Sequence, residues 1–200
     1  MLNSANNEIL TRVGPGTAMG GLFRQFWQPA LLCEELPAPD CPPVRVRLMG
    51  ENFVAFRDSS GKVGLLDAHC PHRLAELFFG RNEEGGLRCV YHGWKFSVTG
   101  ELLDMPSEPA GSPMRCNPNI RAKAYPVHEA GGIVWAYLGP QECVPPLPQM
   151  EFMSLPAQNF YTSKCLMKCN YQQALEGSID TAHLTFCTGP SRPWRRTCST

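Results

Sequence analysis

The sequence has little charge and no long apolar run, and both absences exclude classes of protein. Only 18% of the 200 residues are charged, and acidic and basic residues balance to a formal net charge of zero. A nucleic-acid or anionic-membrane partner needs a basic excess, so we expect neither. No apolar run approaches the length that spans a bilayer. The polar residues 1–14 lack the apolar core of a secretory signal, so we expect a cytoplasmic protein.

Cysteine, in contrast, is plentiful. Ten cysteines are spread along a chain that is 43% hydrophobic, which is enough apolar content for a packed core. A disulfide scaffold would be shorter and secreted, so metal ligation explains at least some of these thiols better. The others are predicted to be ordinary buried thiols, which pack like small apolar side chains.

Short β-like runs, broken by 19 Pro and 18 Gly, dominate much of the chain. Residues 44–48 alternate apolar and charged side chains, as a half-buried strand does. Further strands are predicted at 53–57, 62–66, 87–90, 95–98, 121–127 and 133–138. Many short strands with turn residues between them predict a mainly β, antiparallel module.

Composition divides the chain into four predicted segments. They are an N-terminal lead-in (1–30), the β domain (31–139), a stiff Pro-rich linker (140–156) and the start of an α+β domain (157–200). The lead-in is expected to be helical around residues 18–26. The last segment is expected to open with a strand at 160–168 and a helix from 170 to about 186.

Two mixed pairs, one Cys-x-His and one Cys-x-x-His, are the most informative feature of the sequence. Cys70-Pro71-His72 and Cys89-Val90-Tyr91-His92 each follow a predicted strand, and sixteen residues separate His72 from Cys89. A Rieske [2Fe–2S] cluster needs two thiolates on one iron and two imidazoles on the other. Two loops that each supply one Cys and one His meet that need. We therefore predict that these four residues hold a [2Fe–2S] cluster.

Structural zinc is the alternative use of two cysteines and two histidines. Zinc fingers usually keep each pair as Cys-Cys or His-His, whereas both pairs here are mixed. The mixed pairs favour the Rieske interpretation. The remaining histidines considered, His69 and His128, lie outside the pattern and are expected to have structural or surface roles.

The stretch CPHR…CVYHGWKF resembles the Rieske domain of ring-hydroxylating oxygenases. The segments LTRVGPGTAMGGLFRQFWQPALL, VRVRLMGENFVAFRD and LLDMPSEP resemble the branch typified by phthalate dioxygenase oxygenase components. The resemblance runs from about residue 10 to residue 186. It implies that Cys70 and Cys89 hold the buried iron and that His72 and His92 hold the outer one. One departure is Leu74, where the family commonly has Gly, and it is expected to strain the first cluster loop.

The resemblance implies the oxygenase component of a Rieske non-haem iron oxygenase. Electrons would come from an NAD(P)H-dependent reductase or a ferredoxin and pass through the cluster to a mononuclear Fe(II) that activates O₂. The substrate would be a small aromatic-type molecule, either hydroxylated or O-demethylated. The full-length enzyme would be a homo-oligomer, expected to be a trimer, because each cluster serves the iron of a neighbouring subunit.

A second motif lies in residues 170–183, NYQQALEGSIDTAH. Glu176, Asp180 and His183 would fall on one face of the predicted helix. A 2-His-1-carboxylate triad leaves positions on Fe(II) open for O₂ and substrate. By resemblance, His183 would be a ligand of this iron. Asp180 would be the catalytic bridging carboxylate that carries electrons from the neighbouring cluster.

The second histidine of that motif should fall at position 188, but the sequence has Thr188. We interpret the break as a reading-frame error after Phe186, which leaves residues 187–200 out of frame and the chain truncated. Residues 186–189 can be encoded by TTC TGC ACC GGG, and one restored C after TTC would then give Phe-Leu-His-Arg. A genuine divergent C-terminus is the alternative, and sequencing of the encoding DNA distinguishes the two.

A stand-alone Rieske ferredoxin, which only carries electrons, is the rival function. It would explain residues 40–139 equally well. It would not explain the Pro-rich linker or the EGSIDTAH stretch that follows, and such a chain should stop soon after Leu138. The oxygenase interpretation therefore accounts for more of the sequence.

Overall fold

The computed structural model describes residues 3–182, and these form eleven strands and three α-helices. The helices are α1 (Ser4–Thr11), α2 (Ala18–Phe23) and α3 (Tyr171–Ile179). The strands are β1 (Trp27–Leu32), β2 (Val44–Leu48), β3 (Glu51–Arg57), β4 (Val63–Asp67), β5 (Arg81–Glu83), β6 (Gly86–Arg88), β7 (Lys95–Phe96), β8 (Leu102–Asp104), β9 (Ala124–Tyr125), β10 (Val127–Ala130) and β11 (Ile133–Tyr137). None of the described helices is both long and apolar enough to cross a membrane.

The chain divides into two compact units. One unit, Arg12–Lys164, holds every described strand together with α2. The other combines the start of the chain, up to Thr11, with the residues from Cys165 onward, and it holds α1 and α3. Within this second unit the Tyr171 hydroxyl donates a hydrogen bond to the carbonyl of Leu10.

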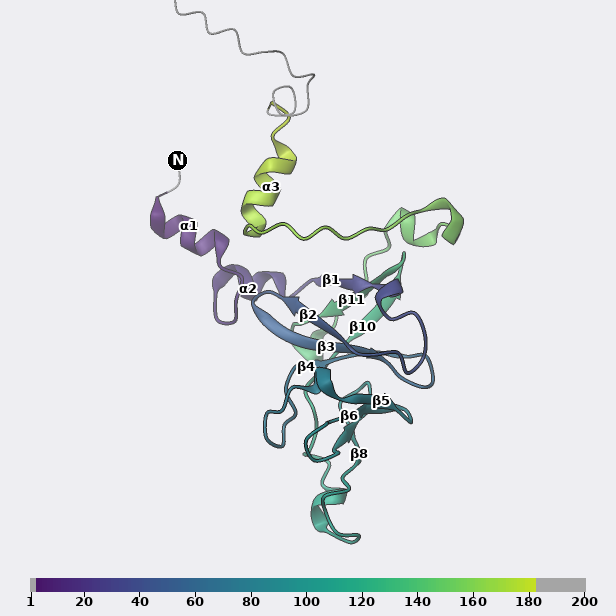
Figure 1. Cartoon of the computed structure of the whole chain (residues 1–200). Helices are drawn as coiled ribbons and strands as arrows, with labels where there is room; N and C mark the ends of the chain where they lie inside the picture. The colour runs from purple at the N-terminus through teal and green to yellow at the C-terminus, as the bar shows by residue number, and fades with distance from the viewer. Residues whose placement is uncertain (1–2, 183–200) are drawn as a thin grey trace, which may run out of the picture. The chain divides into compact units, whose positions relative to one another are not determined.

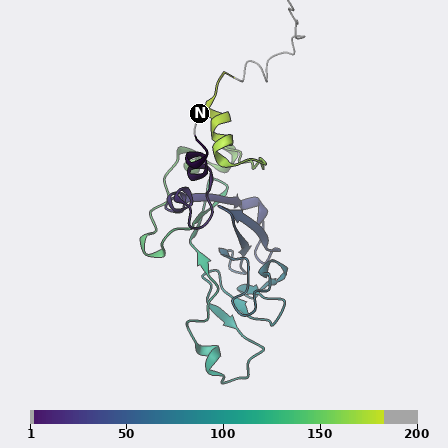
Figure 2. The same ribbon diagram turned by 90° about the vertical axis from the view of Figure 1, so that its left-hand side faces the viewer.

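The strands of the larger unit form three antiparallel sheets, which confirms the predicted mainly β, antiparallel fold. Their strand orders are β1-β11-β10, β2-β3-β4-β9 and β5-β6-β7-β8. Figures 1 and 2 show the β5–β8 sheet at the opposite end of this unit from β1 and β11, with β2–β4 between them. The predicted cluster loops lie toward the β5–β8 end, since Cys89 directly follows β6.

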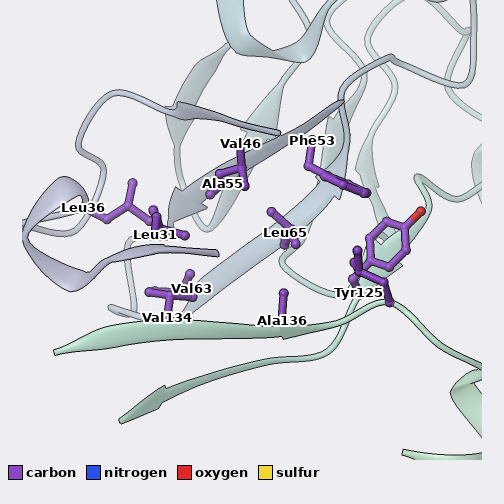
Figure 3. Close-up of a cluster of buried hydrophobic side chains, with 11 residues drawn as sticks. Leu31, Leu36, Val46, Phe53, Ala55, Val63, Leu65, Tyr125, Val134 and Ala136 are labelled. Atoms are coloured by element: carbon purple, nitrogen blue, oxygen red, sulfur yellow. The ribbon is translucent and has the colours of Figure 1, made fainter. Parts of the chain in front are cut away.

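Strand β3 is buried on both faces, which explains its continuous apolar sequence. Successive side chains of a strand point to opposite faces. Phe53 and Ala55 therefore enter one core, while Val54 and Phe56 enter another. Figure 3 shows the first core, where side chains of β2–β4 meet Val134 and Ala136 of β11.

The second core contains the two predicted cluster cysteines. This second core consists of the buried residues Val54, Phe56, Leu66, Cys70, Leu77, Leu87, Cys89, Trp94, Phe96, Met105 and Ala122. It joins the opposite face of β3 and β4 to the β5–β8 sheet. Each large apolar side chain buried in it contributes about 1.5–3 kcal/mol. The cysteine positions therefore depend on the packing of the whole unit.

The two cluster loops have the same backbone hydrogen-bond pattern. Cys70 N–H donates to the Ala75 carbonyl (2.8 Å), and Leu74 N–H donates back to the Cys70 carbonyl (2.9 Å). In the other loop, Cys89 N–H donates to the Trp94 carbonyl (2.8 Å), and Gly93 N–H donates to the Cys89 carbonyl (3.1 Å). The fourth residue after each cysteine has a positive φ. Gly93 adopts it freely at 75°, whereas Leu74 is held at 56°, which bears out the expected strain.

Several predicted elements differ from the structure at the ends of the β domain. The lead-in was predicted to extend to residue 30, yet β1 begins at Trp27 and pairs with β11. The helix predicted at 18–26 is α2 and ends at Phe23. The strand predicted at 160–168 is wrong, since the described residues there pair with no other strand. Instead, the Thr162 hydroxyl bonds the Gly131 carbonyl, and Lys164 pairs with Glu35.

The helix predicted from 170 to about 186 is shorter than expected. It is α3, and its described part ends at Ile179. Asp180 has φ −70° and ψ 105°, outside the helical region, and its carboxylate accepts a hydrogen bond from Ala182 N–H (2.9 Å). Asp side chains commonly compete with the helix in this way. The Asp180 N–H still donates to the Glu176 carbonyl (3.0 Å), so Asp180 lies one turn beyond Glu176 as the C-cap of α3. His183, the third residue of the predicted face, lies outside the described residues.

An ion pair links β3 to β10 and thereby joins two sheets. The Arg57 guanidinium binds both carboxylate oxygens of Glu129, at 3.0 and 2.5 Å, and also donates to the carbonyls of Leu36 and Gly61. Its side chain is only 14% exposed. The hydrogen bond from Arg57 holds the pKa of the Glu129 carboxyl below its ordinary value.

We predict that Leu74→Gly stabilises the protein. Releasing a left-handed leucine recovers about 1–2 kcal/mol, and the added freedom of glycine in the unfolded chain offsets about 0.4–1 kcal/mol of it. The melting temperature, followed by circular dichroism, should rise by about 1–4 °C. Gly93→Ala is the matched control and should lower it, because a Cβ there would lie 2.6 Å from Pro106 Cγ. An unchanged or lower melting temperature for Leu74→Gly would contradict the strain.

We further predict that Glu129→Gln lowers stability at neutral pH by less than about 1 kcal/mol, since the carboxylate is partly exposed. Because the folded pKa of Glu129 is depressed, its contribution is complete above the unfolded pKa of about 4.3 and is lost as pH falls below it. The difference in melting temperature between wild type and variant should therefore shrink below about pH 4.3. Glu142→Gln, on the exposed turn η4 (Gln141–Cys143), is the control. A difference that persists at low pH would exclude the ionic contribution.

Candidate metal centre

The structure brings the four predicted cluster residues together at the ends of β4 and β6. Cys70 is 1% exposed and Cys89 is 3% exposed. The imidazole rings of His72 and His92 lie closer to the surface, with centroids 4.7 Å apart. Two buried thiols and two partly exposed imidazoles therefore form an inner and an outer pair.

The environment of Cys70 suits a metal-bound thiolate. Burial first, and then the neighbouring Cys89, raise the pKa of its free thiol to about 11. The backbone N–H groups of His72 and Arg73 hydrogen-bond the sulfur and lower the pKa in part. Amides directed at a sulfur stabilise its negative charge and, in iron–sulfur proteins, help set the reduction potential.

The surroundings of His72 favour the neutral form of its imidazole. Desolvation lowers the pKa of its imidazole, and the positive charges of a protonated His92 and of Arg73 lower it further. A neutral imidazole is the form that binds metal. The ring plane is also held: the Trp94 indole stacks on it at a centroid distance of 4.3 Å and an angle of 3°.

Arg88 braces the second loop, a role that the sequence analysis missed. Its side chain, 12% exposed, donates to the Gly93 carbonyl (2.8 Å) and pairs with Asp104 (2.8 Å) and Glu83 (2.7 Å). The hydrogen bond from Arg88 holds the pKa of the Asp104 carboxyl below its ordinary value. The only signal in the sequence was a charged residue next to the predicted ligand Cys89.

The donor set fits a two-iron cluster better than a single ion. Structural zinc would need four ligands around one point. Each iron of a Rieske cluster takes only two protein ligands, as the inner and outer pairs here provide.

The second predicted metal site is not assembled by the described residues. Asp180 is exposed beyond the end of α3. His183 and Thr188, together with the stretch predicted to be out of frame, lie outside the described residues. His69 is exposed beside the first loop, and His128 is exposed on β10, so neither joins the four cluster residues.

A hollow of about 450 Å³ lies beside the first loop. Six of its nine lining residues are polar or charged: Glu51, Asn52, Asp67, His69, Arg121 and Lys123, together with Ala68, Pro71 and Leu74. Binding sites for small organic ligands are mostly apolar, so this hollow does not suit an aromatic substrate.

Comparison with known proteins agrees with this geometry. Residues 26–126 match the family model of the Rieske [2Fe–2S] domain. The chain is 50% identical over 187 residues to the 3-chlorobenzoate-3,4-dioxygenase oxygenase subunit of Comamonas testosteroni, covering 93% of this chain and 42% of that protein. It is 45% identical to the phthalate 4,5-dioxygenase oxygenase subunit of Pseudomonas putida, covering 92% of this chain and 41% of that protein. The chain thus spans less than half the length of these relatives.

Solved structures give the same result. The oxygenase of carbazole 1,9a-dioxygenase, solved in complex with its ferredoxin, superposes with a TM-score of 0.55 at 29% identity. The match covers 70% of this chain and 33% of that oxygenase. With a family match across half of its length and the two mixed pairs in place, the chain belongs to the Rieske [2Fe–2S] domain family.

Proposed function

We propose that this chain carries the electron-transfer part of a Rieske non-haem iron oxygenase component. The observation that carries the proposal is the arrangement of two buried thiols and two outer imidazoles on two equivalent loops. Cys70 and Cys89 would hold the inner iron, and His72 and His92 the outer one. When bound, the cluster supplies one-electron redox chemistry at a higher potential than an all-thiolate centre.

The burial of the cysteines and the partial exposure of the histidines determine from which side a redox partner can approach the cluster. The cysteines are sealed in the second core, so a partner cannot approach the inner side. The histidines lie at the surface beside the exposed side chains of Val90 and Tyr91, which are 62% and 61% exposed. Electrons would therefore enter and leave through the imidazole edge.

The activity of the whole enzyme is proposed from its relatives. It would take electrons from an NAD(P)H-dependent reductase or a ferredoxin and use O₂ at a mononuclear Fe(II) to hydroxylate or O-demethylate a small aromatic-type substrate. The names of the 3-chlorobenzoate and phthalate dioxygenase subunits support this class. The carbazole dioxygenase complex supports a ferredoxin as one kind of electron donor.

The second iron site and the oligomer are also proposals. His183 would be an iron ligand, and Asp180 would bridge to the cluster of a neighbouring subunit in a trimer. The exposed position of Asp180 past α3 is compatible with a contact to a second chain. The described residues do not assemble a ligand set for this iron.

The similarity favours an oxygenase over a stand-alone Rieske electron carrier. The alignment with the chlorobenzoate dioxygenase subunit extends over 187 residues, well beyond the Rieske match at 26–126. A carrier would need only the larger compact unit, Arg12–Lys164. The relationship therefore includes the segment that contains α3.

We predict that the purified chain contains about two irons and two acid-labile sulfides. Cys70→Ser and Cys89→Ser should each remove most of both, because serine replaces a soft thiolate that iron prefers. Cys33→Ser is the matched control, since Cys33 packs against the first core, and it should keep the full content. Zinc without sulfide in the wild type would overturn the proposal. Iron in excess of sulfide would instead report a mononuclear site.

We also predict that NADH and a phthalate dioxygenase-type reductase together bleach the visible absorption of the loaded chain, with one electron taken up per chain. Electron uptake follows from a cluster whose histidine edge is accessible. Cys33→Ser should behave like the wild type. A loaded chain that dithionite reduces but the reductase does not would contradict the proposed partner class and leave the cluster assignment intact.

A further inference from the structure

We propose that Trp94 is a positioning residue that fixes the plane of the His72 imidazole, and that Ser107 in turn fixes Trp94. This inference rests on the proposed function, because its importance depends on His72 being a cluster ligand. It concerns side chains outside the ligand set, and two observed contacts carry it: the stack between the rings and the hydrogen bond from the indole.

The stack is the main restraint that we identify on the His72 ring. The neighbouring side chains of Pro71, Arg73 and Leu74 are exposed, so the loop itself encloses the imidazole only partly. The Trp94 indole lies parallel to it, within 3°, at 4.3 Å. Trp94 is 4% exposed and belongs to the second core, so its ring is a rigid support. Ring rotation of His72 would have to break this contact.

A hydrogen bond fixes the indole itself. Trp94 Nε1–H donates to Ser107 Oγ at 3.0 Å. Ser107 belongs to a segment that is anchored on both sides, since Asp104 pairs with Arg88 (2.8 Å) and Arg115 donates to the Glu108 carbonyl (2.7 Å). A third segment of the chain, which supplies no ligand, therefore controls the orientation of one ligand.

The two histidines are supported differently, which makes the inference specific. His92 lies against the Tyr91 ring at 3.8 Å and 39°, and Tyr91 is 61% exposed. His72 is instead supported by a buried ring from the same core that holds both cysteines. The outer pair therefore consists of one imidazole on a rigid indole and one on a solvent-facing phenol.

The stack should also limit water at the outer pair. Reduction adds one negative charge, and nearby water stabilises that charge, so a drier site has a lower reduction potential. The electron-rich face of the indole acts in the same direction, because it disfavours added negative charge beside it. Removing the indole should therefore raise the potential and broaden the range of His72 orientations.

The test uses the cluster-loaded full chain and five variants. Trp94→Leu removes the stack, Trp94→Phe removes the indole N–H, and Ser107→Ala removes its acceptor. Trp135→Phe is the matched control, since Trp135 Nε1–H donates to the Ala130 carbonyl (3.1 Å) outside the second core. The measurements are the reduction potential and the histidine nitrogen hyperfine couplings from pulsed EPR of the reduced protein.

We expect the potential to rise most in Trp94→Leu and less in Trp94→Phe and Ser107→Ala, with one of the two nitrogen couplings altered. Ser107→Thr, which keeps the hydroxyl, should restore the wild-type values, and Trp135→Phe should not move them. If Trp94→Leu binds no cluster, the potentials and nitrogen couplings of Trp94→Phe and Ser107→Ala test the inference instead. Loaded variants with wild-type potentials and couplings would overturn the inference.

Failure of the proposed function is distinguishable from failure of this inference. A wild-type chain that binds no [2Fe–2S] cluster would refute the function but not the contact. The stack would then be judged in the metal-free chain by NMR, because an indole face shifts the His72 ring protons upfield. An equal His72 shift in wild type and Trp94→Leu would overturn the positioning role.

Discussion

Burial of Cys70 and Cys89 in one apolar core is the constraint on which the rest of the site depends. Thiols in that core are forced to stay neutral unless a metal or a set of amides compensates their charge. The core exists because β3 and β4 are apolar on both faces and hold two layers together. The same packing that stabilises the fold therefore places the two sulfurs, and it leaves the histidines at the rim.

The two cluster loops have the same backbone hydrogen-bond pattern in two different environments. Both close with the same pair of hydrogen bonds and both require a positive φ four residues after the cysteine. The first loop meets that requirement with Leu74, which is exposed and strained. The second uses Gly93, whose carbonyl binds Arg88 and whose missing Cβ makes room for Pro106. The second loop is thus the more tightly braced of the two.

Much of the site could be predicted because its chemistry is local in sequence. Two mixed Cys and His pairs after predicted strands were sufficient to place four side chains in one region, and alternation was sufficient to find β2. The rest depends on contacts between distant residues. Nothing near Trp27 indicates that it pairs with Tyr137, and nothing near Ser107 indicates the indole of Trp94.

At the end of α3, a local interaction, rather than a distant contact, made the prediction from sequence fail. The sequence predicted a helix that extends to about residue 186, but α3 ends at Ile179, where the Asp180 carboxylate accepts a hydrogen bond from the Ala182 N–H. Periodicity cannot detect such competition from a side chain, since the same residue suits both a helix and a turn.

The proposed sharing of one [2Fe–2S] cluster by two thiolates and two imidazoles of this chain can be tested by EPR of the dithionite-reduced protein. We expect a Rieske-type signal, with couplings from two histidine nitrogens and with no such couplings when both histidines are replaced by cysteine. A signal without nitrogen couplings in the wild type, or a protein that stays EPR-silent and binds zinc, would contradict it.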